Sequence, residues 1–353
     1  MGVMYLASPV FFMALARYPP IRRYFGPLGL LISVVSIAAS AFVTSIGGLI
    51  ALQGALYSLG CGLIFAPISL YMDEWFSVKK GFAYGVMWAG KSATGIAMPF
   101  VFDSLLKKFG LKATLISWAI ATAVMLLPTL FFLRPRTPLE QAPRKQRLSF
   151  DFLRHTSFWM IQLSIIVQSL GYLMPTTYLA SYAKSIGFSS ITGPILLALF
   201  SVSSVPGGIL HGILGDRISN TKVVLLSSVG SALPIFLLWG FSKHLANMVV
   251  FVICYGFFAG GFSSTWSSMM REIQRDSKGN TDTPLLFGLL MGGRGVGFVI
   301  GGPLSGLLIS KGLSDENIGY ATKYGPMILT TGITALLGAW GPLWKFSSRA
   351  LCK

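Results

Sequence analysis

The chain has 353 residues, of which 53% are hydrophobic and only 11% are charged, and its formal net charge is +17. A soluble domain carries roughly 25% charged residues, so this composition cannot build a water-facing surface of ordinary size. These proportions exclude a soluble enzyme, a secreted disulfide scaffold and a disordered protein. They indicate an all-α polytopic membrane protein.

Eleven stretches reach or approach the length of about 20 apolar residues that crosses a bilayer as a helix. We expect spans near 1–16, 27–45, 47–71, 81–102, 113–133, 156–176, 190–213, 223–241, 246–270, 284–310 and 324–346. Most of the 28 Lys and Arg residues lie in alternate gaps between these spans, which favours loop charge that sets topology over a nucleic-acid surface. The gaps rich in positive charge, and the C-terminus with them, are therefore expected on the cytoplasmic side.

The longest polar gap divides the chain into two halves. We expect an N-terminal half at 1–133 with five spans, a basic cytoplasmic linker at 134–154 and a C-terminal half at 155–353 with six spans. Sliding the chain along itself aligns Gly85 with Gly288 and Lys91 with Arg294, as expected for the internal repeats of membrane transporters. If the halves are repeats, a first helix is expected before Met1.

Several motifs carry a resemblance to a known family. The turn after the seventh span has the form Gly-x-x-x-Asp-Arg at 212–217, residues 75–85 read WFSVKKGFAYG, and residues 168–175 read QSLGYLMP. Residues 294–297 read RGVG and are followed by Gly-Pro at 302–303. Together with the two halves and the basic linker, these motifs resemble the major facilitator superfamily, in its monocarboxylate-transporter branch of fungal type. The resemblance implies two six-helix halves with pseudo-two-fold symmetry.

Two departures from the family pattern bear on mechanism. The family's opening helix with its acidic-Gly-aromatic signature is absent, and Gly208 stands where the family usually has an Arg four residues before the glycine at 212. The resemblance implies a secondary active transporter of a small organic anion, with proton coupling left open by the missing Arg. An exporter of a secondary metabolite or toxin, and a truncated chain impaired in transport, are the alternatives.

Two cations lie inside predicted spans, which makes them the first candidates for substrate binding. A charge at bilayer depth costs roughly 2.5–3.5 kcal/mol on insertion scales, so it is by default a functional hypothesis. Lys91 lies near the middle of its span, and Arg294 about a third of the way into its own. An Arg fork can hold a carboxylate through two hydrogen bonds, whereas Lys acts as a point charge. The competing interpretation is that either cation reaches the membrane surface or bonds backbone carbonyls.

Further candidates are polar groups near the predicted translocation path. Gln168 and Tyr172 share a helix face at i, i+4 and could present hydrogen-bonding groups to a substrate, although Tyr172 equally fits an interfacial anchor. A histidine side chain ordinarily titrates near physiological pH, so His211 is kept as a candidate substrate contact beside its interpretation as a structural histidine. Asp216 and Arg217 are interpreted as a cytoplasmic latch between helices, like the family's loop motif.

The sequence offers no catalytic machinery and no sign of a bound cofactor. It holds no central pair of acids, no His-rich span, no metal-ligand cluster and no nucleotide-binding motif, so neither an enzyme nor direct use of ATP is expected. The expected partners are a small-molecule substrate, a proton where transport is coupled, and the lipid bilayer. The family resemblance implies the plasma membrane as its place.

Overall fold

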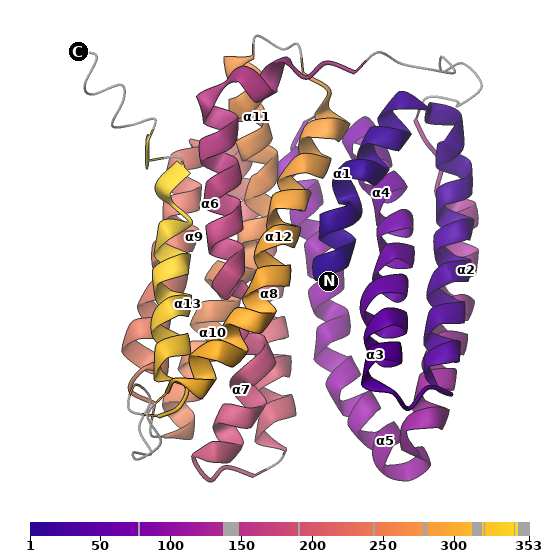
Figure 1. Ribbon diagram of the computed structural model, residues 1–353. Coiled ribbons are helices and arrows are strands. Elements are labelled where there is room, and N and C mark those ends of the chain that lie inside the picture. Colours follow the sequence, from indigo (N-terminus) through magenta and orange to yellow (C-terminus); the bar gives the residue numbers. More distant parts are fainter. Residues whose placement is uncertain are drawn as a thin grey trace. The chain divides into compact units, whose positions relative to one another are not determined.

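Helices make up almost all of the structure, a computed structural model that describes residues 1–76, 78–136, 148–189, 191–242, 244–277, 281–312, 320, 322–341 and 343–344. The helices are α1 (Gly2–Arg17), α2 (Arg22–Ser40), α3 (Ile46–Leu49), α4 (Tyr57–Trp75), α5 (Lys80–Phe132), α6 (Thr156–Tyr172), α7 (Met174–Ser185), α8 (Thr192–Arg217), α9 (Asn220–Pro234), α10 (Leu245–Gly261), α11 (Trp266–Asp276), α12 (Thr283–Ser310) and α13 (Gly325–Leu337) (Figure 1). The predicted all-α membrane fold is confirmed. Residues 137–147 of the predicted linker lie outside the described residues.

Eight helical segments of the described chain are long and apolar enough to cross a membrane, and α1 and α13 are shorter apolar helices. Several of these long segments consist of two or more consecutive helices. α3 continues through the π-helix Ile50–Leu56 into α4, α6 continues into α7 after a break at Leu173, and α10 continues through the 3-10 turn Phe262–Thr265 into α11. The segment Thr156–Ser185 is therefore longer than the span expected at 156–176.

The long helix α5 covers two of the predicted spans. Its 53 residues would measure about 80 Å at 1.5 Å per residue, more than twice the roughly 30 Å of a bilayer core. Gly110 has φ 76° and ψ 177°, a non-helical conformation that divides the helix between the stretches predicted at 81–102 and 113–133. A left-handed φ of this kind favours glycine because a Cβ would be strained there.

The described helices group into two compact units, and the division does not follow the predicted halves. Unit 1 comprises residues 1–78, 101–150 and 280–296, and unit 2 comprises residues 79–100, 151–279 and 297–353. The first part of α5 therefore packs within unit 2, and the first part of α12 within unit 1. The predicted halves describe a repeat along the sequence and stay a prediction.

In unit 1, α1 and α2 both pack against α4. α2 and α4 approach closely where Gly29 faces Gly60, since a Cβ on Gly29 would lie 2.6 Å from the Gly60 carbonyl oxygen. Small residues allow such contacts between membrane helices, where lipid supplies no hydrophobic drive for association. Arg22 Nη1 lies 2.6 Å from Glu74 Oε1 and fixes the start of α2 against the end of α4.

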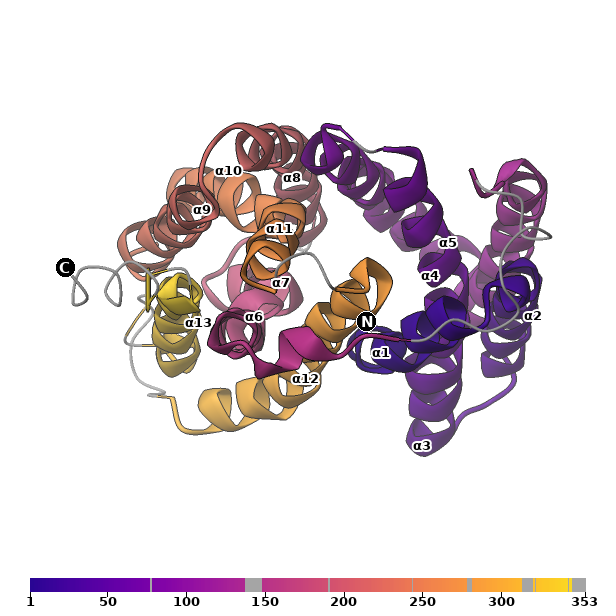
Figure 2. The same ribbon diagram turned by 90° about the horizontal axis from the view of Figure 1, so that it is seen from above.

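In unit 2, α10 packs against both α8 and α9, while α13 packs against α6 and α9 (Figure 2). Aromatic rings fill the space beside α10. The Trp239 and Phe251 rings stack with centroids 5.1 Å apart, and the Phe251 and Tyr255 rings with centroids 5.6 Å apart. Tyr255 donates a hydrogen bond of 3.0 Å to the carbonyl oxygen of Tyr172, which ties α10 to the end of α6.

Candidate functional site

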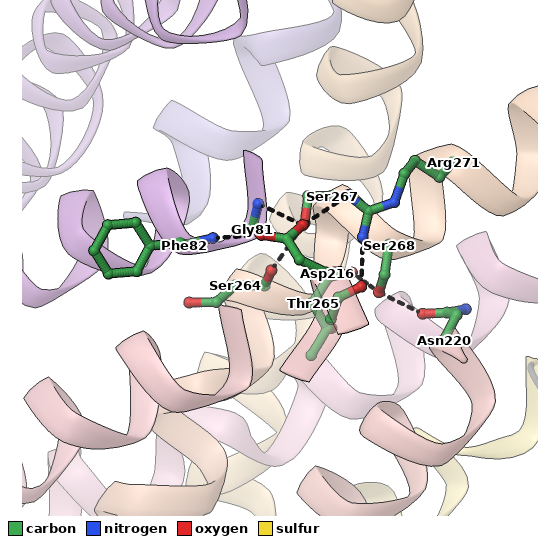
Figure 3. Close-up of polar contacts among 10 residues, drawn as sticks. Gly81, Phe82, Asp216, Asn220, Ser264, Thr265, Ser267, Ser268 and Arg271 are labelled. Atoms are coloured by element: carbon green, nitrogen blue, oxygen red, sulfur yellow. Dashed lines mark hydrogen bonds and ion pairs between the residues drawn. The ribbon is translucent and has the colours of Figure 1, made fainter. Parts of the chain in front are cut away.

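Asp216 lies near the end of α8 and joins three helices of unit 2 through its carboxylate (Figure 3). The Gly81 and Phe82 backbone N–H groups donate to Oδ1 and Oδ2, each at 3.0 Å, and Arg271 Nη1 donates to Oδ1 at 2.8 Å. The first N–H groups of a helix have no partner within that helix, and they carry the positive end of its dipole. The carboxylate of Asp216 thus caps the start of α5 from another helix.

Close backbone contact between α5 and α8 makes this capping geometry possible. A Cβ on Gly212 would lie 2.2 Å from the Gly81 carbonyl oxygen, and a Cβ on Gly85 would lie 2.7 Å from that of Gly208. The spacing of Gly81 and Gly85 matches the spacing of Gly212 and Gly208 because both pairs are one helical turn apart. The glycines bring the start of α5 within hydrogen-bonding reach of Asp216.

A polar cluster on α11 and α9 continues from the Asp216 carboxylate. Arg271 also donates to the Gly215 carbonyl oxygen. Asn220 Nδ2 donates to Glu272 Oε2 at 2.6 Å, and Ser268 Oγ donates to Asn220 Oδ1 at 2.8 Å. These bonds connect the last turn of α8, the first residue of α9 and one face of α11. Because Arg271 of α11 and the first turn of α5 both bind the Asp216 carboxylate, a movement of α11 would change the contacts at the start of α5.

The two residues of the predicted latch, Asp216 and Arg217, differ in the contacts that they make. Asp216 is at the centre of the contacts just described, whereas Arg217 is exposed and forms no ion pair within the described ranges. The cation on the carboxylate is Arg271, which sequence reasoning did not single out. Its distance along the chain, 55 residues from Asp216, left no local spacing by which to pair the two.

Lys91 lies on the part of α5 that belongs to unit 2, beside two buried tryptophans. Its Nζ is 5.6 Å from the centroid of the Trp88 ring, a distance at which a cation is attracted to the ring face. Trp88 meets Trp266 of α11 edge to face, with ring centroids 6.3 Å apart. The Lys91 side chain itself is exposed on the protein surface. The two tryptophans pack as core residues and leave the ammonium group at their edge.

Arg294 lies on the part of α12 that belongs to unit 1, and only 1% of the residue is exposed. One face of this helix packs closely on α1. A Cβ on Gly288 would lie 2.6 Å from Phe12 Cβ, and a Cβ on Gly295 would lie 2.2 Å from the Leu6 backbone nitrogen. The guanidinium is therefore held among packed helices rather than in water. Arg294 and Lys91 belong to different compact units.

The remaining candidates are all buried in unit 2. Tyr172 stacks on Phe298 with ring centroids 6.0 Å apart, so it is a packed residue. Gln168 lies against Gly338, and its Oε1 has no hydrogen-bond partner in the described part of the chain. The two share α6 but contact different neighbours.

His211 is fully buried between α8 and α10. Its Nδ1 lies 2.8 Å from the Gly207 carbonyl oxygen, and its ring meets the rings of Phe257 and Phe258 edge to face. α8 continues to Arg217 rather than ending near 213, so His211 lies inside the helix instead of at its mouth. The imidazole is therefore held by contacts within unit 2, and the role of His211 stays a prediction.

The described residues contain no group of three or more His, Cys, Asp or Glu that could hold a metal ion. The polar groups that do converge are amide N–H groups, hydroxyls and paired charges. Such groups can bind an organic ion or connect helices that move against each other.

Comparison with known proteins places these features in context. The sequence pattern of the Major Facilitator Superfamily matches residues 1–209 and 195–350. The MFS-type transporter pynF of Aspergillus niger is 24% identical over 322 residues, which cover 90% of this chain and 73% of that protein. Monocarboxylate transporter 10 of Danio rerio is 22% identical, covering 85% of this chain and 61% of that protein. The crystal structure of the human organic anion transporter MFSD10 (TETRAN) superposes with a TM-score of 0.64 and 17% identity, covering 96% of this chain and 81% of that chain.

Proposed function

Since this chain belongs to the major facilitator superfamily and is a secondary transporter rather than an enzyme, we propose that its solute is a small organic anion of the monocarboxylate type. Transporters of this kind bind solute near the bilayer midplane and expose the site alternately to the two sides. One relative, monocarboxylate transporter 10 of Danio rerio, is named for the same class of solute, which supports this proposal.

The observation that carries the proposal is the burial of the Arg294 guanidinium within a membrane-spanning helix. Arg294 is the one charged residue of α12, and a charge at that depth is costly to retain unless it is used. A guanidinium presents donors in a fork that matches a carboxylate. We assign Arg294 the role of binding the carboxylate of the solute.

Lys91 supports the same charge preference from α5. Its ammonium is exposed and lies 5.6 Å from the centroid of the buried Trp88 ring, so a carboxylate beside it would meet a cation that the ring holds in place. Gln168, Tyr172 and His211 are more closely packed, and we assign them supporting roles in the walls of unit 2.

One observation favours a second form of the function, export of a metabolite without proton coupling. Gly208 occupies the position where the monocarboxylate branch usually carries an Arg, and in this chain it packs 3.6 Å from the Gly85 carbonyl oxygen, measured to a Cβ built on Gly208. Gly208 packs in the contact between α5 and α8, and it provides no charged group in place of the Arg. An exporter in the plasma membrane with its C-terminus in the cytoplasm is therefore the alternative.

The test is solute counterflow in proteoliposomes with radiolabelled pyruvate and lactate, and with glycerol as the neutral control for leakage. We expect the Arg294→Gln variant to lose counterflow of both acids and the Arg294→Lys variant to retain part of it, because the charge is kept while the fork is lost. Lys91→Gln is expected to weaken apparent affinity with less effect on maximal rate.

Membrane insertion and a monodisperse elution profile of each variant establish that a loss of transport is not a loss of folding. Unchanged counterflow in Arg294→Gln contradicts the assignment of that residue. If the wild-type protein carries neither acid, the monocarboxylate assignment is wrong, and export of a larger metabolite takes its place.

A further inference from the structure

A long apolar groove runs along the outside of unit 2 between α9 and α10, with a volume of about 740 Å³. α9 supplies most of one wall and α10 the other. The groove is lined from α9 by Leu226, Val229 and Leu233, from the π-helix Ile235–Trp239 that follows α9 by Leu237, and from α10 by Cys254 and Phe258. None of these residues takes part in the Asp216 contacts or in the proposed substrate site, so the groove is a separate feature of the unit.

The α9 wall of the groove contains a glycine and a proline, Gly230 and Pro234. A Cβ on Gly230 would lie 2.4 Å from the Phe258 ring, so the ring packs directly on the backbone of α9 there. Pro234 then interrupts the hydrogen bonding of α9, which continues as a π-helix over Ile235–Trp239.

A single cation, Lys222, contributes to the lining that the structure describes. It lies in the first turn of α9, and Leu226, Val229, Leu233 and Leu237 follow it at four, seven, eleven and fifteen residues, the spacing of one helix face. Lys222 is exposed and forms no ion pair within the described ranges, whereas nearby Asp216 is already paired with Arg271. The stripe therefore carries one positive charge at one end and hydrocarbon along the rest.

The stripe is longer than one leaflet of the bilayer core is thick. From Lys222 to Leu237 it extends for about 22 Å, whereas one leaflet of the core measures about 15 Å, so an acyl chain has room along it with the headgroup at Lys222. A void in hydrocarbon leaves its lining without contact atoms on one side, so a chain of similar chemistry fills it. An ammonium group at the start of a membrane-spanning helix lies at the level of the lipid phosphates. It binds anionic headgroups more favourably than zwitterionic ones, whose own cation offsets the phosphate charge.

We propose that the α9–α10 groove binds an anionic phospholipid, with the headgroup phosphate at Lys222 and one acyl chain against Val229, Leu233 and Phe258. The site is distinct from the translocation path, and it stands whatever the transported solute is. Its specificity comes from the Lys222 charge, and its affinity from the apolar wall.

The experiment uses the full chain in phosphatidylcholine nanodiscs that contain a trace of phosphatidylglycerol or phosphatidylcholine with a photoreactive diazirine in one acyl chain. After illumination, mass spectrometry measures labelled peptides from α9 and α10. We expect phosphatidylglycerol to be captured on these peptides about fivefold more than phosphatidylcholine, the preference that one interfacial lysine provides. Lys222→Gln should abolish the preference and Lys222→Arg should keep it.

Two further variants separate charge from shape. Arg275 is an exposed cation at the end of α11 that does not line the groove, so Arg275→Gln is the matched control and should leave the preference unchanged. Leu233 is 52% exposed, so Leu233→Trp can fill the groove without disturbing the core and should reduce capture of both lipids.

Equal capture of the two lipids in the wild-type protein overturns the proposal, as does a preference that survives Lys222→Gln. The groove could instead be covered by a second copy of this chain. The variant with Cys61 and Cys352 replaced by Ala keeps Cys254 as its one thiol, and efficient cross-linking of two copies by a bismaleimide would show that occupant and contradict a lipid site.

Discussion

A single carboxylate, that of Asp216, holds the first turn of α5, the end of α8 and the side of α11 together. It accepts two backbone N–H groups and the Arg271 guanidinium, so its negative charge is matched by a helix N-terminus and by a cation. A hydrogen bond to a charged group contributes about 1.5–3 kcal/mol, somewhat less where water reaches it. The charge rather than the shape of this side chain is therefore the important property.

We expect Asp216→Asn to lower the midpoint of thermal unfolding by about 2–6 °C, because one oxygen still accepts while the charge and one acceptor are lost. Differential scanning fluorimetry in detergent measures the shift. Arg217→Gln is the matched control, since Arg217 is the adjacent exposed residue, and it should change the midpoint little.

The pairing of Asp216 with Arg271 is tested by a double-mutant cycle. If the two groups act as one contact, Asp216→Asn combined with Arg271→Gln should cost less than the sum of the single changes. Strictly additive shifts would mean that Arg271 stabilises α11 through the Gly215 carbonyl alone.

At the scale of the elements, glycines determine where two helices can bring their backbones into contact. The crossing of α6 and α12 shows this at two neighbouring glycines. A Cβ on Gly301 would lie 2.5 Å from the Leu170 carbonyl oxygen, while a Cβ on Gly302 would meet nothing within 4 Å. The sequence presents both as equivalent residues of a glycine-rich helix, but only Gly301 faces the neighbouring helix.

The contrast gives a prediction within one helix. Gly301→Ala should destabilise the protein by about 1–3 kcal/mol, because a backbone oxygen cannot move aside as a flexible side chain can. Gly302→Ala should leave stability unchanged or raise it by roughly 0.5–1 kcal/mol through the better helix propensity of alanine. Thermal unfolding of the two variants side by side measures the difference, and equal effects would contradict the observed crossing.

At the scale of the whole molecule, the distribution of Lys and Arg predicts which ends of the helices face the cytoplasm. α8 runs from Thr192 to Arg217 and so separates the 216–222 turn from the α7–α8 connection by the thickness of a membrane. The turn belongs to the gaps that are rich in positive charge, and the connection, with Lys184 at the end of α7, to those that are poor in it. The two positions should therefore be reached from opposite sides.

Cysteine accessibility tests this orientation in intact cells. In a variant without native cysteines, Lys184→Cys should react with an impermeant maleimide added outside. Arg217→Cys should react only after permeabilisation, because it is expected on the cytoplasmic side. The reverse pattern would place the C-terminus outside and would contradict the positive-inside assignment.

The sequence by itself determined the helical membrane class, the family and the position of most spans, because apolar length and loop charge are local properties that the bilayer imposes on each segment separately. It also identified Lys91, Arg294 and Asp216 as unusual residues, since a charge in or beside a span stands out against apolar neighbours. The tertiary structure alone decided what those residues touch. Arg271 is the partner of Asp216, and the α9–α10 groove lies beside Gly230, because each depends on residues that only packing between helices brings together.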